Sequence, residues 1–127
     1  MKILPIKFVP AFIWLCISFW LLTLPGSSIP HEDWFDTFQV DKWVHIFLFS
    51  ILGLLFMYPF KKSSVDHTSR LPWFLLITIS TIAYGIVMEF VQRDFIPNRS
   101  FDIWDIAADS IGSFIAFGWC NKKYRGI

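Results

Sequence analysis

Charged side chains are scarce in this sequence, and so are cysteines. Asp, Glu, Lys and Arg make up 17% of the 127 residues, against about 25% in a typical soluble domain. The net charge of +1 gives no reason to expect nucleic-acid binding. Cys16 and Cys120 have neither a CxxC spacing nor a framework pattern. We therefore expect no disulfide and no zinc site.

Apolar and aromatic residues take the place of the missing charges. The sequence is 55% hydrophobic and 20% aromatic, with seven Trp and fifteen Phe, and its mean hydropathy is +0.54. A soluble core of this size cannot hide so many large apolar side chains. The composition therefore indicates an integral membrane protein, which we expect to form a single domain over residues 1–127.

Four apolar stretches are long enough to cross a bilayer as helices. They cover residues 8–24, 43–60, 71–91 and 103–120. A helix rises about 1.5 Å per residue, and the hydrocarbon core is about 30 Å thick, so each stretch spans it or nearly does. Single strands cannot cross lipid with unpaired backbone groups. We predict an all-α, polytopic membrane bundle of four transmembrane helices.

The first stretch also has features of a signal peptide, because Lys2 and Lys7 precede its apolar run. However, the run is long and rich in Trp and Phe, and no small-x-small cleavage site follows it. We favour a retained membrane span.

Positive charges predict the orientation of these helices. Eight Lys and Arg residues lie in the N-terminal flank, the loop after the second stretch and the C-terminal tail. The opposite side has three, which are Lys42, Arg93 and Arg99. Loops rich in Lys and Arg stay in the cytoplasm. We therefore expect both termini to be cytoplasmic.

Polar residues interrupt the stretches at the predicted outer face. They are Asp41, Lys42 and His45 in the second, Glu89 and Gln92 in the third, and Asp102, Asp105 and Asp109 in the fourth. Ionisable groups cost several kcal/mol at depth in a bilayer, so each needs a partner or a purpose. Asp109 lies about 9 Å into its helix by the standard rise. We predict an outward-opening polar pocket, with Lys42 and Arg99 as its cations.

Some of these residues also have purely structural explanations. Asp102 immediately precedes the fourth stretch and is a suitable N-cap, and Asp41 is similarly placed before the second. An ion pair of Arg99 with Glu89 or Asp105 would clamp helices together. The acidic stripe of the fourth stretch continues into Gly112, Ser113 and Ala116. Residues this small are expected to face neighbouring helices rather than lipid.

Three blocks of the sequence, in order, resemble the VanZ-like family. They are the D-K-x-x-H segment at 41–45, the aromatic and Gly-rich helix ending in E-x-x-Q at 84–92, and the P-x-R…D block at 97–105, followed by Ile111-Gly112. The family usually has Asn where this chain has Asp109. The resemblance implies a multi-pass protein of the bacterial inner (cytoplasmic) membrane. The family takes its name from a protein that gives low-level resistance to teicoplanin, a glycopeptide antibiotic acting outside the membrane.

Our favoured hypothesis is a non-enzymatic cell-envelope protein. It would bind a lipid-linked or envelope ligand, or alter the access of glycopeptides such as teicoplanin, with membrane lipids as its other partners. Arg99 would contact the anionic part of the ligand through its planar donor fork. The aromatic-rich stretches suit a ligand that has a polar head and an apolar tail. The small size of the chain makes an oligomer plausible.

Two other functions stay open. An enzyme acting on an envelope lipid would use His45 as a general base oriented by Asp41, with Glu89 or Asp105 as the acid. No nucleophile elbow, HExxH or phosphatase-type motif supports it. Proton or ion coupling would use the same carboxylates, but these lie near one face. A His with carboxylates can bind a metal, yet the spacing is not diagnostic, and we expect no metal or cofactor.

Overall fold

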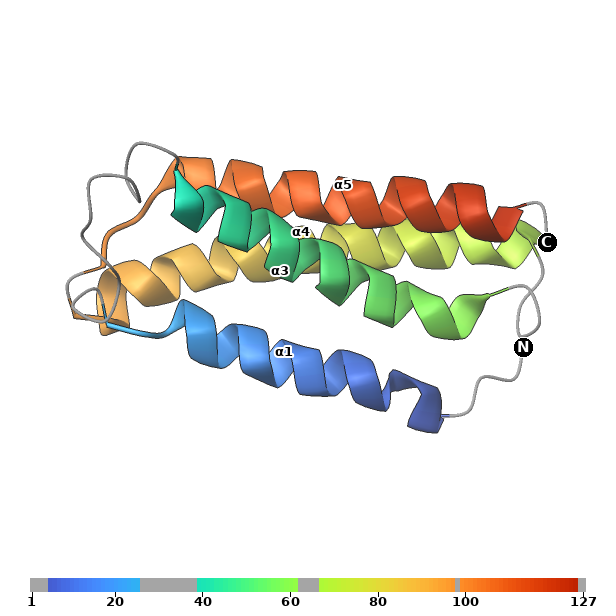
Figure 1. Ribbon diagram of the computed structural model, residues 1–127, viewed down its shortest axis with the longest axis horizontal. Helices are drawn as coiled ribbons and strands as arrows, with labels where there is room; N and C mark the ends of the chain where they lie inside the picture. Colours follow the sequence, from blue (N-terminus) through green and yellow to red (C-terminus); the bar gives the residue numbers. More distant parts are fainter. Residues whose placement is uncertain (1–4, 26–38, 62–66, 98, 126–127) are drawn as a thin grey trace.

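The structure, a computed structural model, describes residues 5–25, 39–61, 67–97 and 99–125, and helices make up nearly all of them (Figure 1). The elements in chain order are the short 3-10 helix η1 (Pro5–Phe8), α1 (Val9–Leu22), α3 (Val40–Met57), the 3-10 helix η3 (Tyr58–Phe60), α4 (His67–Phe95) and α5 (Ile103–Arg125). These residues contain no strand, which confirms the all-α prediction.

Three of the helical segments are long and apolar enough to cross a membrane. They are Pro5–Leu22, Val40–Phe60 and Arg70–Phe95, and they correspond to the first three predicted stretches. The fourth stretch is also a helix, α5, which runs alongside α3 and α4 (Figure 1). It begins with acidic residues, Asp105 and Asp109, which make it less apolar than the others.

The helices lie side by side along one long axis, so the bundle has two distinct ends (Figure 1). The start of α3, the end of α4 and the start of α5 lie at one end, which we call the polar end. The start of η1, the end of η3 and the end of α5 lie at the other, which we call the basic end. Among the described residues, the basic end has Lys7, Lys61, Arg70, Lys122 and Lys123.

Two helices begin differently, and only one of the two predicted caps is present. Asp102 does cap α5, because its Oδ1 accepts a hydrogen bond from the Trp104 amide at 2.9 Å. α3 begins at Val40, before Asp41, and is preceded by Gln39 in the left-handed conformation with φ of 52°. Asp41 therefore lies in the first turn of α3, and its predicted role as the cap was wrong.

The closest contact between helices is that of α5 with α3. A Cβ added at Gly112 would lie 2.5 Å from the Ile46 carbonyl oxygen, and one added at Gly53 would lie 2.6 Å from the Ala116 Cβ. Ser113 and Ala116 are fully buried. The stripe of small residues thus faces inward, as predicted, and allows the two backbones to approach closely.

Polar and apolar side chains are distributed in the opposite way to a soluble protein. Among the described residues, ten polar or charged side chains are buried, including His45, Glu89, Gln92 and Asp109. Large apolar side chains cover the outside, among them Phe12, Trp20, Trp43, Phe47, Ile79, Trp104, Phe114 and Trp119. Lipid solvates apolar surface, whereas buried polar groups need partners inside the bundle. The distribution is that of a protein that lies in a bilayer.

Candidate functional site

The predicted site residues come together at the polar end, where three helix ends meet. α3 contributes Asp41, Lys42 and His45 from its first turns, because residues three or four apart share a helix face. The end of α4 contributes Glu89, and the first turns of α5 contribute Asp105 and Asp109. We call these residues, together with Asp102, the polar cluster.

Lys42 is the centre of one half of the cluster. Its Nζ lies 2.7 Å from Asp41 Oδ2, 2.6 Å from Asp102 Oδ2 and 2.7 Å from Asp105 Oδ1. One ammonium thus neutralises carboxylates from α3 and α5 and joins the two helices. The sequence placed Asp102 among the polar residues at this face but explained it by its role as a cap. Its position three residues before Asp105 was the signal for a second role on the same helix face.

His45 is the centre of the other half. Its Nδ1 lies 2.7 Å from Asp109 Oδ1, and its Nε2 lies 3.7 Å from Asp105 Oδ2. All three side chains are at least nine-tenths buried. Asp109 is therefore the carboxylate that orients His45. The sequence-based hypothesis had assigned this role to Asp41, which instead contacts Lys42.

Glu89 and Gln92, one turn apart on α4, have different partners. Glu89 Oε2 accepts a hydrogen bond of 3.0 Å from the Asp102 amide and so fixes the start of α5 against α4. Gln92 Nε2 donates to the Leu22 carbonyl oxygen at 2.8 Å, which ties α4 to the end of α1. Gln92 is therefore a link to α1 rather than a member of the polar cluster.

Arg99 lies in the segment between α4 and α5, three residues before Asp102, and its side chain is partly buried. Neither Glu89 nor Asp105 forms an ion pair with it, so the predicted clamp is absent. In the described part of the chain, no hydrogen bond or ion pair joins Arg99 to another residue. Lys42 takes over the clamping role, which leaves the Arg99 guanidinium available to a bound molecule.

The charges in the cluster do not balance. The polar cluster has five carboxyl groups but only one ammonium, that of Lys42, and one imidazole. Burial opposes ionisation of Asp102, but hydrogen bonds from Lys42 and from the Trp104 amide outweigh it and lower the pKa of that carboxyl. The cluster thus has more hydrogen-bond acceptors than donors, and a ligand with donors of its own would complement it.

In the part of the chain that the structure describes, two groups of side chains have a spacing that could hold a metal ion. Asp41, Asp102 and Asp105 form one, and His45, Glu89 and Asp109 form the other, with ligand atoms within 4.8 Å of one another in each. The Lys42 ammonium already occupies the centre of the first group. The second group is wholly buried and offers one nitrogen and two oxygen ligands, a set that suits Zn²⁺, Mn²⁺ or Fe²⁺.

The model of the VanZ/LLP1 family matches residues 3–122. An uncharacterised protein of the fission yeast Schizosaccharomyces pombe, C11E3.10, is 32% identical over 102 residues, which are 80% of this chain and 54% of that protein. The chain thus spans about half the length of this relative. No solved structure matches. The family match covers nearly the whole chain, including every residue of the polar cluster, and the chain therefore belongs to the VanZ/LLP1 family.

Proposed function

We propose that the protein is a four-span membrane protein whose polar cluster binds the head group of a lipid or lipid-linked ligand from the outer side of the membrane. α5 packs along α3 and α4 over its length, so it would cross the bilayer with them. The Lys and Arg residues of the basic end would lie in the cytoplasm. In a bacterial cell this arrangement belongs to the inner membrane, and the polar cluster opens outward.

The observation that carries the proposal is the contrast between Lys42 and Arg99. Lys42 already contacts three carboxylates at 2.6–2.7 Å, so it has no donor left for a ligand. Arg99 has no such partner among the described residues and offers a planar fork that fits a phosphate. A phosphate on Arg99 would lie beside carboxylates, which accept hydrogen bonds from an ammonium or from sugar hydroxyls.

This chemistry favours a lipid head group that combines a phosphate with hydrogen-bond donors. Altered access of teicoplanin would then be a consequence of lipid binding at the outer surface. If so, alanine at Arg99 removes any teicoplanin phenotype while the protein still folds and inserts.

Native mass spectrometry of the purified protein tests the proposal with phosphatidylethanolamine and phosphatidylcholine. Both lipids have a phosphate, but only the first has ammonium N–H donors. We expect phosphatidylethanolamine to bind about tenfold more tightly, as charged hydrogen bonds are worth about 1.5–3 kcal/mol. Arg99→Ala should weaken the binding of both lipids, because both carry the phosphate that Arg99 would contact. Arg93→Ala is the matched control, because Arg93 is exposed near the same end and pairs with Asp94. Equal binding of both lipids, or equal effects of both substitutions, would refute the proposal.

An enzymatic function is the second candidate, and the 2.7 Å contact of His45 with Asp109 favours it. A carboxylate that orients an imidazole prepares its other nitrogen to accept a proton. Purified protein incubated with radiolabelled envelope lipids should then release a water-soluble head group, and Asp109→Asn should slow that release. Absence of turnover with every lipid class of the host membrane would remove this candidate.

Ion coupling lacks comparable support. Thr81 Oγ1 lies 2.8 Å from Ser113 Oγ, so polar groups do extend along the bundle interior beyond the cluster. An apolar core that includes Met57, Phe74 and Ala116 lies between these hydroxyls and the basic end. A proton would have no relay across this core, and we do not propose transport.

A further inference from the structure

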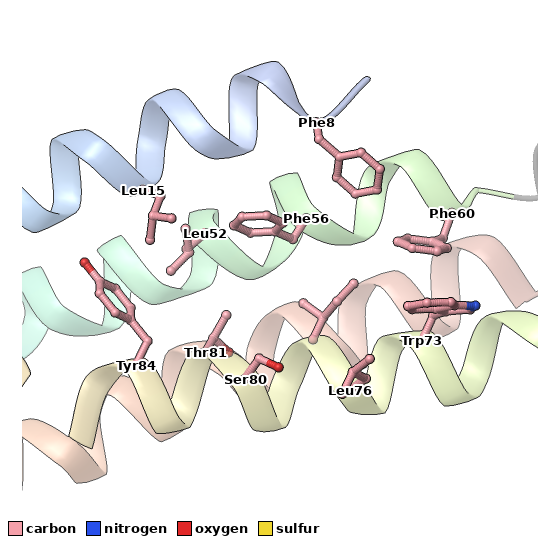
Figure 2. A pocket seen from close by; sticks show the side chains of 11 residues that line it. Phe8, Leu15, Leu52, Phe56, Phe60, Trp73, Leu76, Ser80, Thr81 and Tyr84 are labelled. Carbon is pink, nitrogen blue, oxygen red and sulfur yellow. The ribbon is translucent and has the colours of Figure 1, made fainter. Parts of the chain in front are cut away.

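A second feature lies away from the polar cluster, in the half of the bundle nearer the basic end. It is an apolar cavity of about 420 Å³ between α1, α3 and α4, and Figure 2 shows side chains from all three helices around it. Small-molecule sites have volumes of about 300–1,000 Å³. The lining residues include Leu15, Leu52, Phe56, Leu76 and Tyr84.

The cavity is open on one side and closed at one end. Trp73 and Leu76 line it, yet they are 36% and 51% exposed, so it opens sideways along α4. At the end toward the polar cluster, the Tyr84 hydroxyl lies 3.0 Å from Ser18 Oγ and joins α4 to α1. A long molecule would therefore enter from the side or from the basic end, and its tip would stop at Tyr84.

The length of the cavity matches one leaflet of a bilayer. Trp73 and Tyr84, near its two ends, are separated by about 16 Å along α4 at a rise of about 1.5 Å per residue. The hydrocarbon core is about 30 Å thick, so one leaflet contributes about 15 Å. An acyl chain fits this length and the apolar lining, and the exposed side of α4 would face the bilayer that supplies it.

Aromatic rings and basic residues surround the mouth of the cavity. Phe60 meets the Phe8 ring edge-on at 5.8 Å and stacks on Trp73 at 5.1 Å. Lys7 and Lys61 are the chain neighbours of Phe8 and Phe60. Lys61 Nζ donates a hydrogen bond to the Tyr58 hydroxyl at 3.1 Å. Rings at the membrane boundary beside ammonium groups are suited to a lipid with an anionic head.

We propose that the cavity holds one acyl chain of an anionic glycerophospholipid from the leaflet at the basic end, with its phosphate at Lys7 and Lys61. The proposal uses the membrane-spanning arrangement above but not the polar cluster. It therefore adds a second lipid site in the opposite leaflet. This site would prefer an anionic head group, whereas the polar cluster would prefer a head group with an ammonium donor. Loss of binding at the cluster would leave it unaffected.

Photocrosslinking in nanodiscs tests the site. Phosphatidylglycerol with a diazirine on its acyl chain should label the peptides that contain Leu76 and Tyr84. The labelling should saturate as the probe concentration rises. An excess of unlabelled phosphatidylglycerol should suppress it. Leu76→Trp would fill the cavity and remove the label, whereas Ile79→Trp, on the outward face of α4 with 64% of its side chain exposed, should not. Labelling that does not saturate, or that Leu76→Trp leaves unchanged in a folded protein, would overturn the proposal.

The head-group preference is measured by comparing this probe with phosphatidylcholine that carries the same diazirine on its acyl chain. Each lysine near an anionic lipid contributes roughly fivefold to affinity. We expect Lys7→Gln and Lys61→Gln each to lower the affinity for phosphatidylglycerol, measured by its competition with the probe, about fivefold. Lys122→Gln, exposed on α5, should have little effect. Equal labelling by the two lipids would overturn the assignment of an anionic head. Binding at the polar cluster, measured with phosphatidylethanolamine, should not change in any of these variants.

Discussion

The two halves of the bundle are built on opposite principles. At the polar end, buried charges and hydrogen bonds connect α3, α4 and α5, and every buried side-chain nitrogen and oxygen of the described residues has a partner. Toward the basic end, α1 stands beside α3 and α4 with an apolar cavity between them. The polar end is thus held by specific, directional contacts. The other half has interior space that lipid is suited to fill.

The largest effect should come from the buried pair of His45 and Asp109. Asp109→Ala leaves the buried imidazole without its hydrogen-bond partner, which should cost about 3 kcal/mol. Asp109→Asn keeps an acceptor and should cost much less. Unfolding of both variants in mixed detergent micelles measures the difference. Similar stabilities for alanine and asparagine would show that the pair does not hold the polar end together.

The next effect should come from the backbone contact of α5 with α3. A Cβ at Gly112 would lie 2.5 Å from the Ile46 carbonyl oxygen and 3.0 Å from the Ser50 nitrogen. Neither backbone atom moves without displacing α3, so Gly112→Ala should cost about 1–3 kcal/mol. Gly118→Ala is the control, because an added Cβ there has no neighbour within 4 Å. Thermal melting in detergent compares the two, and equal melting temperatures would contradict the close packing.

Lys42→Met should reverse the dependence of stability on pH. In the wild type, Lys42 helps to lower the pKa of Asp102, so this contribution is complete above the carboxyl's usual pKa and is lost as the pH falls through the lowered value. Without Lys42, three carboxylates repel one another at pH 7, and protonation relieves the repulsion. We expect a loss of about 1–3 kcal/mol at pH 7 that becomes smaller in acid. Urea unfolding from pH 7 to about pH 3, below the usual pKa of an Asp carboxyl, tests this, and a loss that does not change with pH would contradict it.

The smallest effect should come from the hydrogen bond at the closed end of the cavity. Tyr84→Phe removes the contact of its hydroxyl with Ser18 at 3.0 Å, which should cost about 1 kcal/mol. Ser18→Ala should add little to Tyr84→Phe if the two hydroxyls act together. A double-mutant cycle of unfolding free energies measures the coupling. Fully additive effects would show that this hydrogen bond does not join α1 to α4.

Much of this arrangement could be predicted from the sequence, because lipid imposes strong constraints. Long apolar stretches predict helices, and charges inside them predict buried contacts, so Asp105 and Asp109 identified the buried face of α5. Partner choice could not be predicted. Asp41 and His45 share a helix face, but they do not pair with each other. Asp41 contacts its sequence neighbour Lys42, and His45 contacts Asp109 from the distant α5. Side-chain reach and the angle between α3 and α5 decide such pairs, and neither is visible in residue spacing.

The cavity was missed entirely, and for a related reason. Its lining is made of ordinary membrane-helix residues such as Leu15, Leu52 and Leu76, whose pattern is the same whether α1 packs tightly or stands apart. The Ser18–Tyr84 contact was equally hidden, since both residues also suit a lipid boundary. Only the placement of α1 against the other helices distinguishes a packed interface from an open one.

Both binding proposals require the two ends of the bundle to lie on opposite sides of the membrane, and cysteine labelling in intact cells measures this directly. In a Cys16→Ala, Cys120→Ala background, Ser100→Cys marks the polar end and Lys123→Cys marks the basic end. A membrane-impermeant maleimide should label Ser100→Cys in intact spheroplasts. It should label Lys123→Cys only after the spheroplasts are lysed. The reverse pattern, or labelling of both positions before lysis, would contradict an outward polar cluster.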